Sequence, residues 1–303
     1  MKSIPLLVFF HAVLIGQWET INQPDMGTIS LITCGGNGLI AATNQAQVYQ
    51  SIDEGNSWQL LGDTLPTQPY GADLLFEKDG AVFFTQNIGE GPYNFRCIAG
   101  FAGWMWQELP HQSSALISMV ANDSLIFTLL NGISISSDLG ESWTAIPDPP
   151  LTGYIKLLFA TNNFLYVSHG CQVYRTPDLG DTWEDVTGML DEEGYEAPYS
   201  CSSVMSLAPH GNQLIISMYW GGGVGKLFVS DDQGLNWTVL NTFPVDNHVY
   251  TMLSKNYVLY VGTASSSSGL FYTGDLDYWT DFSDGLESYD LSTIQLAATE
   301  EYL

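Results

Sequence analysis

A short polar motif that ends in tryptophan recurs along this chain, and it constrains the fold more than any other feature. The motif has the form S/T-x-D-x-G-x-x-W and is complete in four places, spelled SIDEGNSW, SSDLGESW, TPDLGDTW and SDDQGLNW. The residues at its fixed positions are Ser51, Asp53, Gly55 and Trp58; Ser136, Asp138, Gly140 and Trp143; Thr176, Asp178, Gly180 and Trp183; and Ser230, Asp232, Gly234 and Trp237. A shorter fifth copy contains Thr273, Asp275 and Trp279. Such regular repetition predicts a repeat architecture.

The motif itself predicts a structural turn that carries no chemistry. Its Asp carboxylate can accept hydrogen bonds from backbone N–H groups of the same turn, and its Gly supplies the positive φ that the loop requires. Its Trp begins the next strand and can wedge between neighbouring hairpins. We therefore expect Asp138→Ala to lower thermal stability and to leave any binding function intact.

The segments between the motifs predict four short antiparallel strands in each repeat. Tryptophans recur roughly every 40 residues, a period typical of propeller blades with four strands. One unit reads YIKLLFAT, FLYVSH, VYRT and WEDV, all β-branched or aromatic segments bounded by turn residues. The predicted fold class is all-β, a β-propeller of four-stranded antiparallel blades.

The ends of the chain bear on the number of blades. Six units are complete, although the second, FRCIAGFAGWMW at its end, lacks the motif. The segment WETI at 18–21 is typical of a lone fourth strand, and 291–303 of a first strand with the start of a second. We predict seven blades, six complete and one partial, in a chain that is C-terminally incomplete; the alternative is a six-bladed ring with loose ends.

The four motif copies resemble the Asp-box, also called the bacterial neuraminidase (BNR) repeat, of β-propellers. This superfamily includes sialidases, some xyloglucanases, sortilin-type receptors and photosystem II assembly factors. The resemblance covers nearly the whole chain from Trp18 onward. It implies a propeller fold, whereas the functions of its members are too diverse to imply one activity.

The N-terminus predicts export from the cytoplasm. Residues 1–16, MKSIPLLVFFHAVLIG, combine one Lys with an apolar stretch that is too short for a membrane span of about 20 residues. We predict a signal peptide at 1–16 and a single propeller domain at 17–303, secreted to an extracellular or periplasmic location, with no membrane span. The alternative for this segment is a buried first strand.

The charge of the chain restricts its partners. The 33 acidic residues outnumber the 7 basic residues, which are scattered, and the net charge is −26. Nucleic acid and anionic membrane surfaces are therefore not expected as partners. The five histidines have no metal-ligand spacing, and GGGVGK fails as a phosphate-binding loop. We predict no cofactor, no metal and a monomer.

Four cysteines are too sparse to form a disulfide scaffold. Cys171 falls in a predicted second–third turn, and Cys201 ends the long insertion 187–201 of the adjacent blade. Because both lie on the same predicted face, we expect a Cys171–Cys201 disulfide.

The face formed by the second–third turns and the blade-to-blade connections has the longer and more variable loops, so it is the predicted site. Its aromatic residues are candidates for stacking on a ligand: Tyr93, Tyr154, Tyr195, Tyr199, Tyr219, Trp220 and Tyr250. Its candidate catalytic carboxylates are Glu90, Glu196, Asp246 and Glu287. Aromatic rings beside paired carboxylates are typical of sugar clefts.

The families that the chain resembles differ in the residues and domains that their activities require, and the composition of this chain can be compared with each requirement. Family sialidases hold the substrate carboxylate with three arginines, whereas this chain contains only Arg96 and Arg175. Two arginines also cannot form the arginine-rich patch of the photosystem II assembly factors. Xyloglucanases of this type are tandem propellers, and sortilin-type receptors carry disulfide-rich tails.

The leading hypothesis is therefore a secreted, non-catalytic β-propeller scaffold that binds a glycan or a protein. The alternative is a glycoside hydrolase of unknown substrate that uses paired carboxylates and is not a sialidase.

Overall fold

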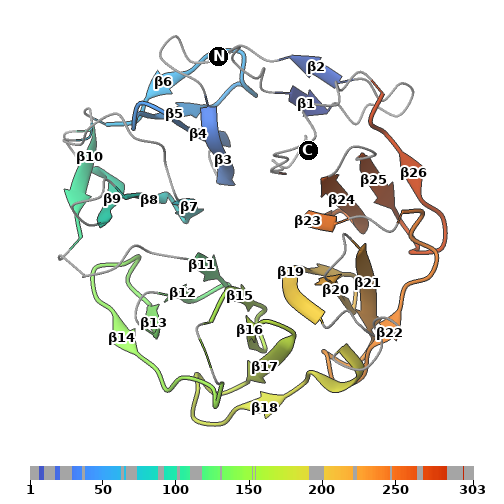
Figure 1. The fold of residues 1–303 in the computed structure, drawn as a ribbon. Helices are drawn as coiled ribbons and strands as arrows, with labels where there is room; N and C mark the ends of the chain where they lie inside the picture. The colour runs from blue at the N-terminus through green and yellow to red at the C-terminus, as the bar shows by residue number, and fades with distance from the viewer. Residues whose placement is uncertain are drawn as a thin grey trace. The chain divides into compact units, whose positions relative to one another are not determined.

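The computed structural model describes residues 7–9, 18–20, 29–35, 38–62, 65, 74–87, 92–100, 103–109, 118–129, 132–151, 153, 155–190, 201–220, 224–245, 248–264, 269–284 and 296. The chain forms two compact units, which are Met1–Ala145 with Ala297–Leu303, and Ile146–Leu296. Each unit contains three four-stranded antiparallel sheets, which we call blades A to C and blades D to F (Figure 1). In every blade the four strands are consecutive in sequence and each pairs with the next.

The first unit begins with a small sheet in which β1 (Leu7–Phe9) pairs with β2 (Trp18–Thr20). Blade A contains β3 (Ile29–Gly35), β4 (Gly38–Thr43), β5 (Val48–Ser51) and β6 (Gln59–Leu60). Blade B contains β7 (Leu74–Lys78), β8 (Ala81–Asn87), β9 (Pro92–Gly100) and β10 (Gly103–Glu108). Blade C contains β11 (Ser118–Ala121), β12 (Ile126–Leu129), β13 (Ile133–Ser136) and β14 (Thr144–Ala145).

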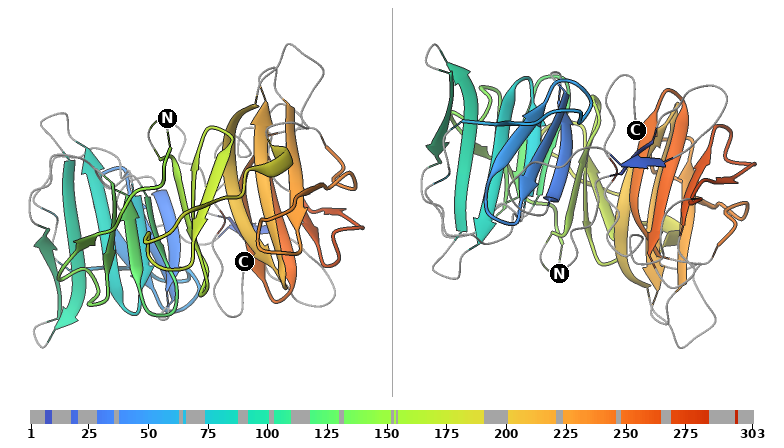
Figure 2. Two further views of the ribbon diagram at one scale, coloured as in Figure 1. Left: turned by 90° about the horizontal axis from the view of Figure 1, so that it is seen from below. Right: turned by 90° about the horizontal axis from the view of Figure 1, so that it is seen from above.

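The second unit repeats this order. Blade D contains β15 (Leu157–Ala160), β16 (Leu165–His169), β17 (Gln172–Thr176) and β18 (Glu184–Asp185), followed by a 3-10 turn, η1 (Gly188–Leu190). Blade E contains β19 (Cys201–His210), β20 (Gln213–Trp220), β21 (Val224–Ser230) and β22 (Thr238–Val239). Blade F contains β23 (His248–Lys255), β24 (Val258–Ala264), β25 (Leu270–Thr273) and β26 (Thr280–Asp281). Figure 2 shows the strands of each blade side by side in two further views.

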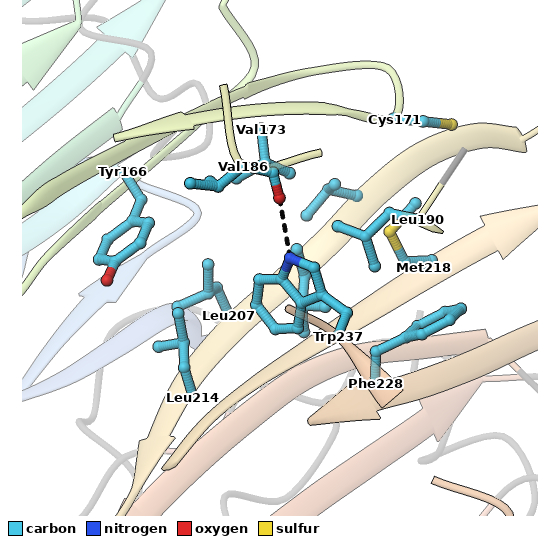
Figure 3. Packing of buried hydrophobic residues seen from close by; sticks show 12 residues of the cluster. Tyr166, Cys171, Val173, Val186, Leu190, Leu207, Leu214, Met218, Phe228 and Trp237 are labelled. Carbon is cyan, nitrogen blue, oxygen red and sulfur yellow. Dashed lines mark hydrogen bonds between the residues drawn. The ribbon is translucent and has the colours of Figure 1, made fainter. Parts of the chain in front are cut away.

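The hydrophobic cores lie between successive blades. Consecutive residues of the inner strands are buried, as in β4 and β12, so a sheet presents buried side chains on both of its faces, and within each unit successive blades pack face to face. The core between blades D and E joins Tyr166 and Val173 to Ile216, Phe228 and Trp237, all of them buried. Figure 3 shows Trp237 in the middle of this cluster. Comparable clusters join blades A and B, B and C, and E and F.

The prediction of six complete four-stranded blades is confirmed, and the prediction of a seventh blade is wrong for the described residues. Trp18 was expected to begin the lone fourth strand of a blade, but Trp18–Thr20 pairs with Leu7–Phe9 in a two-stranded sheet instead. Of the C-terminal segment 291–303, only Leu296 is described, and it belongs to no strand. The signal peptide at 1–16 stays a prediction.

The repeated turns are closed by their own side chains. In the copy at 136–143, the Ser136 hydroxyl accepts a hydrogen bond from the Gly140 N–H at 2.8 Å and donates one to the Asp138 carboxylate at 2.7 Å. Asp138 also accepts from the Ser142 N–H at 2.9 Å and from the Ser142 hydroxyl at 2.6 Å. The turn is therefore held largely by hydrogen bonds of the Ser136 and Asp138 side chains, together with a backbone bond from the Glu141 N–H to the Asp138 carbonyl at 3.3 Å.

The glycine of the motif is required by both backbone angle and space. Gly140 has a φ of 80°, and a Cβ atom built on it would lie 2.6 Å from Cε1 of Phe83 in blade B. Leu139, one residue earlier, also has a positive φ, 54°. Two successive left-handed residues fold the chain back sharply, and β14 begins at Thr144, so Trp143 lies directly before the strand that it was expected to begin.

The other copies repeat this network. The hydroxyl of Ser51, Thr176 or Ser230 accepts from the motif Gly and donates to the motif Asp in each case. The carboxylate of each Asp also accepts hydrogen bonds from the backbone N–H and the side chain of the residue before Trp, which is Ser57, Thr182 or Asn236. In the shorter copy, Asp275 accepts instead from the backbone N–H groups of Asp277 and Tyr278.

These contacts predict a loss of stability in acid. The side-chain and backbone hydrogen bonds from Ser142, followed by the bond from Ser136, lower the pKa of Asp138 to about 2, and similar bonds lower the pKa values of Asp53, Asp178 and Asp232. A carboxylate whose pKa is lowered by folding stabilises the protein fully above its unfolded pKa, about 4, and loses that contribution as the pH falls toward 2. Thermal unfolding between pH 5 and pH 2 should therefore show a falling Tm that begins below about pH 4.

Asp138→Asn provides the control for this acid prediction. The variant keeps the size of the side chain and removes one of the titrating groups, so its Tm should be lower at pH 5 and should converge with the wild-type Tm near pH 2. A constant difference in Tm between the two proteins across this range would contradict the assigned role of the carboxylate.

Tryptophans connect blade E to blade D and blade B to blade A. The Trp183 and Trp237 indole N–H groups donate to the carbonyls of Pro147 and Val186, both at 2.9 Å, just after the preceding fourth strand. In blade B, which lacks the motif, Trp106 donates to the Leu61 carbonyl at 2.8 Å in the same way. The connection between blades therefore persists where the turn that usually carries it is missing.

Candidate functional site

Most of the predicted site residues lie outside the described residues. These are the four candidate carboxylates Glu90, Glu196, Asp246 and Glu287 and the tyrosines Tyr154, Tyr195 and Tyr199. Tyr93 and Trp220 lie on β9 and β20, but their side chains are not described. The two remaining candidates, Tyr219 and Tyr250, are described, and the structure brings them together.

Tyr219 and Tyr250 flank a histidine at the junction of blades E and F. The rings of Tyr219 and His248 meet edge to face, with centroids 4.1 Å apart and planes at 63°. His248 and Tyr250 lie 5.8 Å apart, and Nδ1 of His248 is 3.4 Å from the Tyr250 hydroxyl. Tyr219 and His248 are half-buried, whereas Tyr250 is 48% exposed. We call these three residues the aromatic seam.

A β-bulge places Tyr250 in this position. In the β23–β24 ladder, Val249 pairs with Thr263 and Thr251 pairs with Gly262, so Tyr250 has no partner and the register shifts. The extra residue bends the strand and redirects its side chain, which is a common device beside binding sites. The buried Ser217 hydroxyl of blade E donates to the Val249 carbonyl at 3.2 Å and fixes the backbone next to the bulge.

The seam can bind a ligand by stacking and by hydrogen bonding. The exposed Tyr250 ring offers a π-face to an apolar, planar or cationic group, and its hydroxyl can donate or accept. His248 is not among the residues predicted for the site, because the histidines have no metal-ligand spacing in the sequence. Its position two residues before a candidate tyrosine, at the start of a strand, was the available signal.

Cys171, at the turn between β16 and β17, is disulfide-bonded. The side chain of Cys201, its predicted partner, is not described, so the pairing stays a prediction. A backbone hydrogen bond joins the turn that contains Cys171 to β19: the Val204 N–H donates to the Gly170 carbonyl at 2.8 Å. Cys34 and Cys97 carry thiols, and burial raises the pKa of Cys97 to about 12.

Both arginines of the chain connect neighbouring blades. Arg175 of β17 donates to the Gln233 carbonyl in the turn of blade E at 2.6 Å and forms a 2.7 Å ion pair with Glu184. Arg96 of β9 donates to the Leu139 carbonyl in the turn of blade C at 2.9 Å. Both side chains are buried. Neither guanidinium faces solvent, so neither can bind an anionic ligand at the surface.

The described residues contain no group of three or more His, Cys, Asp or Glu side chains that could hold a metal ion. Within the same residues, no helix has the length and apolar character needed to cross a membrane.

No protein-family model and no curated protein matches the chain. Solved structures do match it. The chain is similar to YCF48 in its structure bound to D1 peptide, with a TM-score of 0.61, 16% sequence identity and coverage of 90% of this chain and 86% of that chain. It is also similar to the computationally designed Ika8 protein, with a TM-score of 0.53, 16% identity and coverage of 82% of this chain and 71% of that chain. These similarities concern the fold: the chain is an all-β propeller of four-stranded antiparallel blades.

Proposed function

We propose that this protein is a non-catalytic β-propeller scaffold that binds a protein ligand at the aromatic seam of Tyr219, His248 and Tyr250. The observation that carries the proposal is the bulge in β23, which exposes Tyr250 beside two half-buried rings. A rigid aromatic group that lies against partly buried neighbours binds at a low entropic cost, which is why tyrosines dominate many recognition surfaces.

Two observations favour a protein ligand over a glycan. The similar YCF48 structure contains a bound peptide. The net charge of −26 favours a segment with lysine or arginine, because a cation can lie over the Tyr250 ring while the acidic surface attracts it from a distance.

The proposed scaffold is secreted and belongs to the Asp-box group of propellers. The hydrogen-bond network that four turns share supports the second assignment. The predicted signal peptide at 1–16 and the disulfide-bonded Cys171 support the proposal that the protein is secreted, since disulfides persist in oxidising compartments.

An array of synthetic peptides of varied charge, probed with the full chain, tests this proposal. Peptides that carry lysine or arginine beside an apolar residue should bind, and Tyr250→Ala should weaken the best of them by about 10- to 100-fold, as expected for an interface hot spot. Ser217→Ala should weaken the same peptides less, because it acts only through the Val249 backbone.

The matched control is Tyr278→Ala. Tyr278 lies in the repeated turn of the same blade and is 80% exposed, so its removal should leave the affinity unchanged. Equal losses in Tyr250→Ala and Tyr278→Ala would contradict the seam as the site. Oligosaccharides released from neutral or acidic polysaccharides by the wild-type chain, but not by Glu196→Gln, would contradict the non-catalytic assignment.

A further inference from the structure

Blade B differs from the other five blades in its outer strand. β10 spans six residues, Gly103–Glu108, whereas β6, β14, β18, β22 and β26 span two residues each. The cause is local. In the other blades the repeated turn leads the chain away from the third strand, and only two register pairs form afterwards. Blade B lacks this turn, so β9 and β10 stay paired from Gly103–Gly100 to Glu108–Phe95.

The register shows which backbone groups of β10 face outward. The Leu109 N–H donates to the Asn94 carbonyl at 2.8 Å, so this is a hydrogen-bonded pair. Hydrogen-bonded pairs alternate in an antiparallel ladder, which directs Gly103, Met105 and Gln107 toward β9. The N–H and C=O groups of Trp104, Trp106 and Glu108 therefore point to the open side, where no described strand pairs with them. In β6 the same register leaves only Leu60 outward.

This edge lacks most of the features that usually block pairing with another chain, and Glu108, at the end of β10, is its one charged residue. Natural edge strands are short, bulged or carry Lys or Pro, but the β9–β10 ladder is regular and GWMWQE contains neither residue. Figures 1 and 2 show β10 as the last strand of its sheet. Met105 is 60% exposed and offers an apolar contact to an added strand.

The charge around the edge indicates what can occupy it. Glu108 is exposed at the end of β10, and Glu141 is exposed beside blade B, 3.8 Å from the buried Arg96. The whole chain carries a charge of −26, which disfavours a second copy as the occupant. We propose that β10 is a docking strand for an extended segment of a partner protein with alternating basic and apolar residues, which adds to blade B as a fifth strand.

Hydrogen exchange of the full chain with an acetylated, amidated (Lys-Val)4 octapeptide tests this inference. The amides of Trp104, Trp106 and Glu108 should exchange at least tenfold more slowly when the peptide is present. A (Glu-Val)4 octapeptide, and a (Lys-Val)4 peptide N-methylated at every residue, which leaves neither of its edges able to pair, should give no protection. Unchanged exchange at these three amides would overturn the proposal, as would equal protection by the N-methylated peptide.

Substitution at the edge gives a second readout. Glu108→Pro removes an outward N–H without breaking the ladder and should reduce, at least tenfold, the protection that (Lys-Val)4 gives to the Trp104 and Trp106 amides. Leu60→Pro is the matched control, because Leu60 holds the equivalent position in β6, and it should have no effect. Protection of the same amides that rises with protein concentration and needs no peptide would assign the edge to a second copy and overturn the assignment to a basic segment.

The docking strand and the aromatic seam share no residues, so the two proposals can fail separately. Tyr250→Ala should leave the amide protection of β10 unchanged, and Glu108→Pro should leave seam binding unchanged.

Discussion

Trp237→Ala is expected to lower the free energy of unfolding by about 3–5 kcal/mol, the range for removing a large buried aromatic side chain. Trp237 is 3% exposed and belongs to the core between blades D and E. Alanine would leave a cavity beside Phe228 and Val186 and would remove the hydrogen bond to the Val186 carbonyl (Figure 3). Denaturant unfolding of the two proteins measures the difference.

Two further variants separate the contributions of packing and hydrogen bonding at this position. Trp237→Phe keeps most of the apolar contact, loses the indole N–H and leaves a smaller void than alanine does, so it should cost at least about 1–3 kcal/mol, the range for an unsatisfied buried carbonyl, and less than Trp237→Ala. Trp183→Ala should cost less than Trp237→Ala, because Trp183 is only half-buried. A change below about 1 kcal/mol for Trp237→Ala would contradict the assigned role of the motif tryptophan.

Arg175→Met is expected to cost about 2–4 kcal/mol, because hydrogen bonds to charged groups contribute about 1.5–3 kcal/mol each. Arg175 connects blade D to the turn of blade E through the Gln233 carbonyl and is held in place by Glu184. Methionine retains most of the aliphatic contact and removes the guanidinium, so the loss reports on the polar contacts.

Arg175→Lys is the control for this change. Lysine keeps the charge but has no planar fork, so it cannot contact Glu184 and Gln233 together and should recover only part of the loss. Full stability in Arg175→Met would mean that the guanidinium is not structural, and the exclusion of an anionic ligand at this position would fail with it.

The repeated turns were predictable because their contacts are local. The residues that hydrogen-bond to one another in a turn are at most four positions apart, as are Ser136, Asp138, Gly140 and Ser142, so the sequence motif alone indicates the geometry of the turn. The four-strand period was equally readable, even in blade B, where Trp106 keeps its contact with the preceding blade although the turn is absent.

The fold could not be predicted where strand pairing depends on residues that are distant in the sequence. Trp18 was assigned to a seventh blade because its residue type fits a fourth strand, but the strand partner is Leu7–Phe9. Strand pairing is set by the whole sheet, and a three-residue segment does not specify its own partner.

The aromatic seam was partly predictable. Tyr219 and Tyr250 were candidates because aromatic residues gathered in variable loops, whereas the bulge that exposes Tyr250 depends on the register of β24 and has no local signature. His248 joined the site through its contact with Tyr219 of the adjacent blade. The open edge of β10 follows from the missing motif, which the sequence revealed, and from the hydrogen-bond register, which it did not.

Hydrogen exchange of the full chain with the tightest peptide from the array tests the central claim most directly. The proposed scaffold predicts slowed exchange in 217–220 and 248–251, on both strands that form the aromatic seam, with the repeated turns of the same blades unchanged. A footprint confined to the repeated turns, or exchange that is unaltered on both strands while the peptide is bound, would contradict it.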